Sequence, residues 1–417
     1  MINPAFALEL TAESLDPRVT FSRALNTATR INSAGLLENV NADTARFDYD
    51  PISLACRGLL IEETRVNGFT YSEAFNDASW VAGNLVKSAS VVTDPRGNTN
   101  AIRFTATAGL AVKFVAKTYT ASAGTTQSVS FLVRAGTHSF IQIYNNGDAQ
   151  AFCNFDLTSG VVGTAGTKTT GAIKALKNGW YICTATFGTT TTYGTGWRVY
   201  FAPSASATYG QSLNAVGTES VDFFFGQIEA GAFPTSLITT TTTAMTRNAD
   251  IATITGANFS DWWQAGKGSA LVRARPSVVS GTRPLIQFDD TTGGNIIALR
   301  GNATNPELYV RTGGSDQVQI DAGTIAANTS YRLAGSWAEN SCAASINSGT
   351  PVLDGVATIP VVTQSRLGSD GTNYLNGHLE AVEYYDERVL DASLQVVSST
   401  AGYRSIIGPV FRDAIIS

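Results

Sequence analysis

The feature that most constrains this chain is a period-two alternation of apolar and polar residues that recurs between residues 128 and 386. Successive side chains on a strand point to opposite faces of its sheet, so this pattern indicates strands with one buried face. The clearest alternating segments are residues 128–135, 140–146, 180–187, 197–203, 221–230, 270–276, 284–290, 307–313, 331–337 and 378–386. Gly, Asn, Asp, Pro and Thr separate them. Spacings of roughly 8–15 residues, with no helices between, predict an all-β protein of antiparallel sandwiches.

The chain length predicts more than one domain, because 417 residues exceed the roughly 250–300 at which a single core stops growing. We expect four parts: an N-terminal attachment or oligomerisation segment, two sandwiches and a C-terminal tail, with bounds 1–66, 67–248, 249–402 and 403–417. Five threonines from Thr239 predict an extended connection between the sandwiches. The best helix signal is residues 389–399, which Asp391 is expected to cap. The apolar tail is expected to dock on its own fold or on a neighbouring subunit.

Composition argues against several classes of protein. The net charge of −5 and the pI near 5.2 do not suit a nucleic-acid binder, which normally has a basic stripe. No apolar run approaches the roughly 20 residues of a membrane span, so we expect no membrane insertion. The first residues lack a basic and then apolar leader, which predicts synthesis in a cytoplasm without a signal peptide. Four cysteines without a CxxC motif predict buried free thiols.

Catalytic motifs are not evident. A glycosidase needs two carboxylates that face each other across a cleft. Glu380 and Glu383 are three residues apart, so on a regular strand they are expected to face opposite sides. The sequence has no GxSxG motif, and its two histidines, His138 and His378, have no motif context. We therefore expect a protein that is not an enzyme.

Two groups of residues are candidates for sugar binding, because aromatic faces and amide groups suit a pyranose. Tyr193 and Trp197 flank a loop rich in Gly and Thr, and binding residues often lie on loops. Tyr144, Asn145 and Asn146 end an alternating segment. The alternative for the second group is a solvated hairpin turn, because Asn-Gly is itself a turn signal.

Calcium is the one cofactor that the sequence suggests. Asp94, Asn98 and Asn100 lie in one loop and could offer the oxygen ligands that Ca²⁺ prefers. Such loops also arise from turn chemistry alone, which is the alternative explanation.

Residues 46–67, RFDYDPISLACRGLLIEETRVN, are about twice as rich in charge as the chain average of 15%. Their charged members are Arg46, Asp48, Asp50, Arg57, Glu62, Glu63 and Arg65. Arginine–carboxylate pairs shielded at an interface fix register and orientation. We expect this stretch to be a joint whose charges lie at a subunit or virion interface. A solvated surface and a ligand site are the alternatives.

Three stretches resemble known modules, the first two from bacteriophage virion proteins. The first, SRALNTATRINSAGLLENVNADTARFDYDP followed by CRGLLIEETRVN, is similar to an N-terminal virion module. The second, from YSEAFNDASW to VDFFFGQIEAGAFPTSLI and residues 246–250, resembles a phage-type carbohydrate-binding jelly roll, although Leu237 stands where an aromatic residue is usual. The third, LGSDGTNYLNGHLEAVEYYDERVLDASLQ, resembles the end of a concanavalin A-like, laminin-G-like sandwich.

The resemblance implies a fibre, spike or decoration protein of a virion, mounted by residues 1–66. Its partners would be its own copies in a homotrimer, other capsid or tail proteins, and a host-surface glycan. Two alternatives remain open: a receptor-binding tailspike with polysaccharide hydrolase activity, and a purely architectural virion protein.

Overall fold

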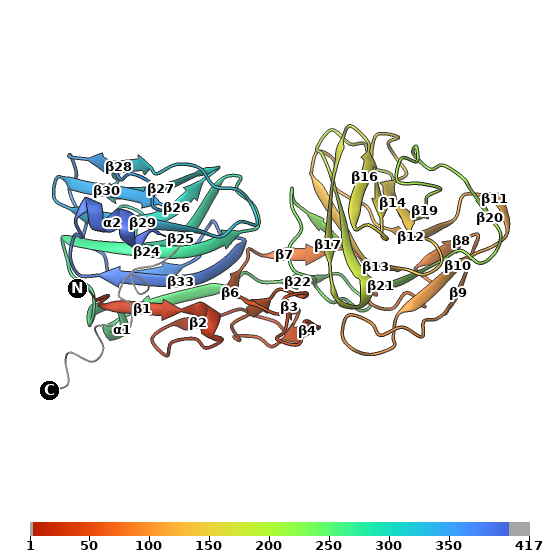
Figure 1. The fold of residues 1–417 in the computed structure, drawn as a ribbon, viewed down its shortest axis with the longest axis horizontal. Coiled ribbons are helices and arrows are strands. Elements are labelled where there is room, and N and C mark those ends of the chain that lie inside the picture. The colour runs from red at the N-terminus through yellow and green to blue at the C-terminus, as the bar shows by residue number, and fades with distance from the viewer. Residues whose placement is uncertain (1–2, 400–417) are drawn as a thin grey trace.

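The computed structural model describes residues 3–399, which form four large antiparallel sheets and three two-stranded ribbons. The sheets pack in pairs, so the predicted all-β sandwich architecture is confirmed. Figure 1 shows the two sandwiches as lobes that lie side by side along the long axis of the molecule.

The jelly roll, residues 68–244, packs two six-stranded sheets around an aromatic core. One sheet has the order β17 (Thr169–Ala175), β18 (Trp180–Phe187), β13 (Gln127–Ala135), β21 (Ser220–Ala230), β10 (Ile102–Ala106) and β9 (Leu85–Ala89). The other has the order β16 (Val161–Ala165), β15 (Phe152–Asp156), β14 (Phe140–Asn145), β19 (Gly196–Phe201), β12 (Phe114–Thr118) and β8 (Val81–Gly83). The ribbon of β11 (Gly109–Ala111) and β20 (Leu213–Ala215) lies at the far tip (Figure 1). Trp80 stacks on Phe75 in the core, with ring centroids 4.3 Å apart.

The second sandwich also has two sheets, and its core contains Trp337 and Tyr384. Its larger sheet has the order β31 (Val352–Asp354), β30 (Ser341–Ile346), β29 (Tyr331–Ala338), β24 (Lys267–Pro276), β33 (Gly377–Tyr385), β6 (Cys56–Ile61) and β5 (Phe47–Tyr49), with β1 (Phe6–Glu9) also on β33. The other sheet has the order β2 (Thr20–Ser22), β23 (Ile251–Thr255), β32 (Gln364–Leu367), β25 (Thr282–Asp289), β26 (Ile296–Asn302), β27 (Asn305–Thr312) and β28 (Ser315–Asp321).

The N-terminal residues are part of the second sandwich, whereas the sequence suggested a separate segment, residues 1–66. Strand β1 pairs with β33, and β2 pairs with β23. Phe6 and Leu59 are at most 2% exposed and lie in the same core as Trp337. These strands are only three to six residues long, so their alternation is too brief to be recognised in the sequence. That this region attaches the chain to a virion stays a prediction.

Gly58 allows β6 to pair with β33. Its φ is +99°, in the left-handed region that favours glycine. A Cβ added at this position would lie 2.1 Å from the carbonyl oxygen of Leu379, which is far inside van der Waals contact. Any side chain here would therefore displace β6 from its partner strand.

The jelly roll is inserted into the second sandwich through a two-stranded ribbon. Strand β7 (Arg65–Asn67) leads the chain out, and β22 (Met245–Arg247) leads it back, with Arg65 opposite Arg247. The threonine run was expected to make this connection, and that expectation was wrong. Thr240 lies on the jelly roll, where its amide donates to Ser72 Oγ at 2.8 Å and its hydroxyl to the carbonyl of Phe69.

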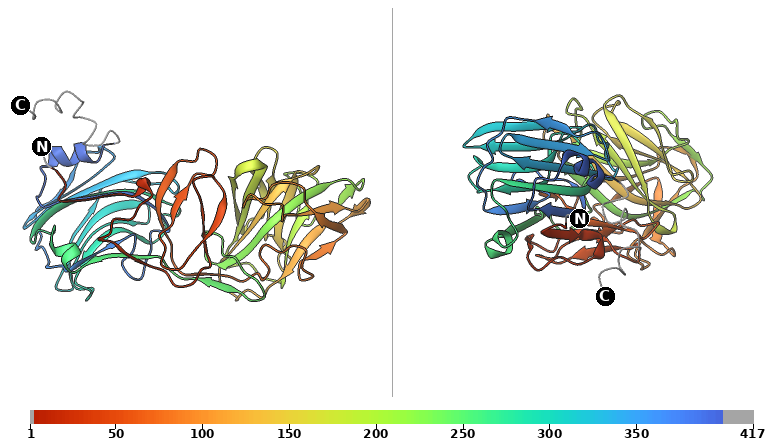
Figure 2. Two further views of the ribbon diagram at one scale, coloured as in Figure 1. Left: turned by 90° about the horizontal axis from the view of Figure 1, so that it is seen from below. Right: turned by 60° about the vertical axis from the view of Figure 1, so that its left-hand side comes forward.

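The hairpin of β3 (Ala28–Ile31) and β4 (Leu37–Val40) stands between the two lobes, as Figure 2 shows. Ile31 and Leu37 join a cluster of buried apolar residues with Trp180 and Phe225, on the face of β18 and β21 that points away from the jelly-roll core. At the hairpin end, the amide of Leu37 donates to the carbonyl of Pro95 at 2.8 Å. The hairpin thus fixes the jelly roll against the second sandwich.

Helices are few among the described residues: α1 (Ala257–Ser260), α2 (Asp391–Val397) and two short 3₁₀ turns. The predicted cap of α2 was wrong, because Leu390 holds the cap position and no side chain caps it. Asp391 is instead the first helical residue, where a negative charge suits the helix dipole, and it pairs with Arg388 at 2.7 Å. No helix in residues 3–399 is long and apolar enough to cross a membrane. The predicted tail, residues 403–417, lies outside the described residues.

Replacing Leu59 by Ala tests whether the N-terminal residues are part of the second sandwich. Leu59 is fully buried, so we expect the free energy of unfolding to fall by about 2–5 kcal/mol. Amide hydrogen exchange should become faster in the second sandwich and should stay unchanged in the jelly roll. Leu110→Ala is the control, because Leu110 is 73% exposed. Equal protection of both lobes in Leu59→Ala and wild type would contradict the assignment.

Candidate functional site

Five charged side chains, the joint network below, meet where the chain leaves and re-enters the second sandwich. They are Arg23, Arg46, Glu62, Arg247 and Asp250. Arg46 pairs with Asp250 and, at 2.8 Å, with Glu62. Arg23 pairs with Asp250 at 3.0 Å, and Arg247 lies 3.5 Å from Glu62. Two carboxylates therefore hold three guanidiniums that are at most 1% exposed.

Burial and pairing oppose each other in the joint network. Burial alone would raise the pKa of Glu62, but the charges of Arg247 and Arg46 hold it well below its usual range. Burial would lower the pKa of Arg46, but Asp250 and Glu62 outweigh it and raise that pKa. At Arg247 burial prevails and lowers the pKa. Removing one partner of such a pair leaves an uncompensated buried charge, at a cost of about 3–5 kcal/mol.

The joint network unites two of the stretches that resemble phage modules. Arg46 and Glu62 come from RFDYDP and GLLIEE, and Arg247 and Asp250 come from TRNAD. The backbone amide of Glu62 also donates to Asp250 Oδ2 at 2.9 Å. Glu62 and Asp250, almost 190 positions apart in the sequence, are therefore in direct contact at the base of the jelly roll.

Further ion pairs surround the joint network. Asp48 Oδ2 lies 3.0 Å from His378 Nε2, and Asp48 Oδ1 accepts the amide of Ile31 at 2.7 Å. Burial would raise the pKa of Asp48, but its hydrogen bond to His378 contributes to a net lowering. The remaining charges of the stretch pair with one another, Arg57 with Asp50 at 2.5 Å and Arg65 with Glu63 at 2.7 Å.

These contacts correct the expectation of a subunit or virion interface for four of the seven charged residues in 46–67. Arg46, Asp48, Glu62 and Arg65 are all less than 9% exposed and are paired within one chain. These four side chains are therefore internal, whereas an interface role for Asp50, Arg57 and Glu63, which are half-buried, stays a prediction. The sequence showed the concentration of charge, but it could not show that the partners lie near residues 250 and 378.

A cleft of about 520 Å³ lies beside the joint. One wall is the outer face of the jelly-roll strands β13, β17 and β18. The opposite wall comes from β24, β33 and the residues around 277 and 328, and β3, β5 and β6 lie between. The cleft-lining residues are Thr29, Arg30, Ile31, Leu37, Asp48, Arg57, Leu60, Glu62, Ser130, Ala172, Ile173, Lys174, Ile182, Thr184, Phe233, Pro234, Thr235, Ser236, Leu237, Arg275, Ser277, Asn328 and His378.

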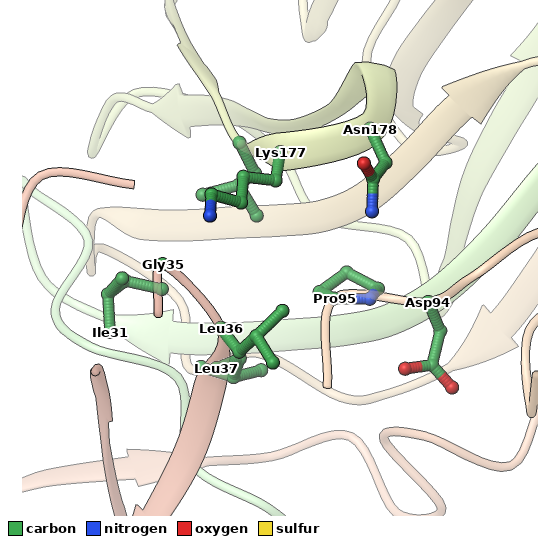
Figure 3. A pocket seen from close by; sticks show the side chains of 9 residues that line it. Ile31, Gly35, Leu36, Leu37, Asp94, Pro95, Lys177 and Asn178 are labelled. Atoms are coloured by element: carbon green, nitrogen blue, oxygen red, sulfur yellow. The ribbon is translucent and has the colours of Figure 1, made fainter. Parts of the chain in front are cut away.

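A second hollow lies under the hairpin and is too small for a ligand. Figure 3 shows it between Leu36 and Leu37 on one side and Lys177 and Asn178 on the other, with Pro95 beside them. Its volume of about 10 Å³ is close to the least that holds one water molecule. We interpret it as a packing defect of the hairpin contact.

The predicted calcium loop is closed by its own carboxylate. Asp94 Oδ1 accepts the amides of Arg96 and Asn98, and Oδ2 accepts that of Asn100, at 2.8 to 3.0 Å. Asn98 and Asn100 thus contribute backbone donors to this carboxylate. In residues 3–399, no three His, Cys, Asp or Glu side chains form a group suited to a metal ion. The geometry supports the alternative of turn chemistry.

The predicted sugar-binding residues are brought together, but mainly as internal supports. Trp197 is fully buried, and its Nε1 donates to the carbonyl of Tyr119 at 3.0 Å. Tyr193 packs against Trp197, with ring centroids 5.3 Å apart. Asn145 is fully buried and donates to the carbonyl of Gly194 at 2.9 Å.

The other two members of these groups differ in exposure. Tyr144 is 2% exposed, and its hydroxyl bonds to that of Tyr200. Asn146 is exposed, and its Oδ1 accepts the amide of Gly196 at 2.9 Å. The expected loop rim is therefore a packed junction between a hairpin and a loop, in which Asn146 is exposed and Tyr193 is half-buried.

Glu380 and Glu383 share one face of their sheet, so the expectation of opposite faces was wrong. An irregularity between Arg273 and Ala274 shifts the register of β24 and β33. Glu380 pairs with Arg273 at 2.8 Å, and the hydroxyl of Tyr385 donates to Glu383 at 2.5 Å. Both carboxylates are thus engaged by neighbouring side chains. That the chain is not an enzyme stays a prediction.

The cleft residues that sequence reasoning missed come from distant positions. Lys174 and Thr184 lie on the jelly roll, whereas Arg275, Asn328 and His378 lie on the second sandwich. No local motif marks them, because the cleft exists only once the two lobes are joined.

No family model matches this sequence, and no curated protein does. Among solved structures, the Ruminococcus gnavus IT-sialidase CBM40 bound to α2,3-sialyllactose is 13% identical, with 33% of this chain and 84% of that chain covered and a TM-score of 0.29. A heptameric SAP-like pentraxin from Limulus polyphemus is 14% identical, with coverages of 33% and 72% and a TM-score of 0.27. The NanB sialidase of Streptococcus pneumoniae is 10% identical, with coverages of 34% and 26% and a TM-score of 0.30. Likenesses this low carry no argument about function.

Replacing Glu62 by Gln tests the joint network. At pH 7 we expect the free energy of unfolding to fall by about 3–5 kcal/mol, because Arg46 and Arg247 lose a buried countercharge. A carboxyl whose pKa is depressed by folding stabilises the fold above its unfolded pKa of about 4.3, and this is lost as pH falls. Denaturation measured from pH 7 to pH 3 should therefore show a shallower loss for Glu62→Gln than for wild type.

The control for this measurement is Glu387→Gln. Glu387 is 64% exposed and pairs loosely with Lys267 at 3.7 Å, so its loss should cost less than about 1 kcal/mol. Equal stability and equal pH dependence of Glu62→Gln and wild type would contradict the role given to the joint network.

Proposed function

We propose that this chain is a non-enzymatic surface component of a bacteriophage particle that binds host-surface glycans in the cleft between its two sandwiches. The single observation that carries the proposal is the cleft itself, about 520 Å³ in volume and lined by both polar and apolar side chains. Ligand sites are commonly concave, of this size, and located between domains.

The chemistry of the cleft suits a sugar. Ser130 and Thr184 present hydroxyls 2.8 Å apart on the jelly-roll wall, and Ser277 and Asn328 offer further polar groups on the opposite wall. These groups can serve the hydroxyls of a saccharide.

Apolar side chains lie between the polar ones. Ile173 and Ile182 on the jelly roll and Leu60 on β6 line the same cleft. A pyranose ring has an apolar face as well as a rim of hydroxyls, so it needs both kinds of surface.

The walls of the cleft are held in place before any ligand arrives. The joint network, the β7–β22 ribbon and the hairpin fix the jelly roll to the second sandwich at three points. A preformed site loses less free energy to ordering when it binds.

The virion part of the proposal rests on the sequence resemblance. It includes synthesis in the host cytoplasm, assembly into the particle as a homotrimer, and contact with other capsid or tail proteins. A hydrolytic tailspike and an architectural protein without ligand are the competing functions, and the experiment below separates them.

Filling the cleft tests the proposal. Ala172 is exposed on β17 and lines the cleft, so Ala172→Trp should obstruct the site without disturbing a core. A glycan array first identifies the glycans that wild type binds. We expect the affinity of Ala172→Trp for these glycans to be lower by about tenfold or more, because the indole would occupy the space that the sugar needs. Ala149→Trp is the control, since Ala149 is an exposed residue of the jelly roll outside the cleft lining.

The outcomes distinguish the three functions. Undiminished binding by Ala172→Trp would place the glycan elsewhere and contradict the assignment of the cleft. Release of new reducing ends from a bound polysaccharide would favour the tailspike hydrolase. Failure of the wild-type chain to bind any glycan would favour the architectural protein.

A further inference from the structure

The charges that line the cleft are unbalanced. Four cationic side chains, Arg30, Arg57, Lys174 and Arg275, lie in its lining with only two carboxylates, Asp48 and Glu62. The protein as a whole carries a net charge of −5, so the cleft is locally opposite in sign to the chain.

The two carboxylates are already engaged and do not oppose an anion in the cleft. Asp48 accepts the amide of Ile31 and pairs with His378. Glu62 is bound by Arg46 of the joint network and by the amide and hydroxyl of Ser236. Both carboxylates are therefore already paired with groups of the protein itself.

The arginines of the lining have partners, and their carboxylate partners lie outside the lining. Arg30 pairs with Glu38 at 2.6 Å, and Arg57 pairs with Asp50 at 2.5 Å. Arg275 lies 3.5 Å from Glu380, and its Nη1 donates to the carbonyl of Asn328 at 2.9 Å.

Lys174 is the exception, because it has neither a hydrogen bond nor an ion pair with any described residue. It lies on β17, is half-buried, and lines the cleft. Burial lowers the pKa of its ammonium group, and the charge of Asp48 acts in the opposite direction. An ammonium that is partly desolvated and unpaired gains more from an incoming anion than a solvated one does.

We infer that the cleft selects saccharides that carry a negative charge, with Lys174 as the contact that recognises the charge and with Arg57 and Arg275 in the lining of the same cleft. The inference rests on the proposed function and specifies its ligand class. A carboxylate, a phosphate or a sulfate on the sugar shares the required chemistry. Each accepts charge-assisted hydrogen bonds from an ammonium group.

The experiment uses the full chain and a glycan array that contains matched pairs. The pairs are oligogalacturonate with its methyl ester, and sulfated with unmodified maltohexaose, so that each pair differs mainly in charge. We expect wild type to prefer the charged member wherever a pair is bound, and the preference to weaken as salt is raised. The two pairs separate carboxylate from sulfate recognition.

Variants of Lys174 identify the residue responsible. Lys174→Met keeps the aliphatic stem and removes the charge, so we expect about a tenfold or greater loss of affinity for the charged glycan. Lys174→Arg keeps the charge and should retain most of the affinity. Lys267→Met is the matched control, because Lys267 lies on the second sandwich outside the cleft and is 45% exposed.

Each outcome bears on one claim. Equal binding of charged and neutral members, or a preference for neutral glycans, overturns this inference and leaves glycan binding intact. Binding of charged glycans that Lys174→Met does not weaken overturns the role of Lys174. An array with no bound glycan at all overturns the proposed function together with this inference.

Discussion

Three buried guanidiniums that share two buried carboxylates fix the geometry of the joint between the two lobes. Arg23, Arg46 and Arg247 would each destabilise the fold if left unpaired, and Glu62 and Asp250 remove that cost only in one geometry. Because the carboxylates come from both crossings between the lobes, the network fixes where the jelly roll departs and where it returns. Such pairs add little to net stability compared with apolar packing, but they discriminate strongly against other arrangements.

The placement of the jelly roll follows from the joint network. The second sandwich is closed by strands from both ends of the described chain, so the jelly roll is a loop of that sandwich enlarged into a domain. Its outer face, rather than its tips, is turned toward the neighbouring lobe, with the β3–β4 hairpin wedged between (Figure 2). The cleft lies beside this hairpin. Its polar and cationic lining comes from both sandwiches, so neither sandwich alone would form it.

The sequence predicted the parts of the fold that have long alternating strands. Residues 128–135 and 180–187 correspond to β13 and β18, because the apolar and polar alternation of strands of this length is long enough to recognise. Strand β1 has four residues and pairs with β33 more than 370 positions away, which no local pattern can show. Likewise, Trp197 follows a loop rich in Gly and Thr, but packing against Phe187 and Tyr193 places it inside. The charged joint was visible in composition, while its partners and the cleft depend on tertiary contacts.

The central claim is that the two sandwiches form one preassembled site, and hydrogen exchange of the full chain with and without a bound glycan tests it most directly. The account predicts that the ligand slows exchange in both walls at once, in β17 and β18 on the jelly roll and near residues 328 and 378 on the second sandwich. Protection confined to one lobe, or to the loops at the far tip of the jelly roll, would contradict it.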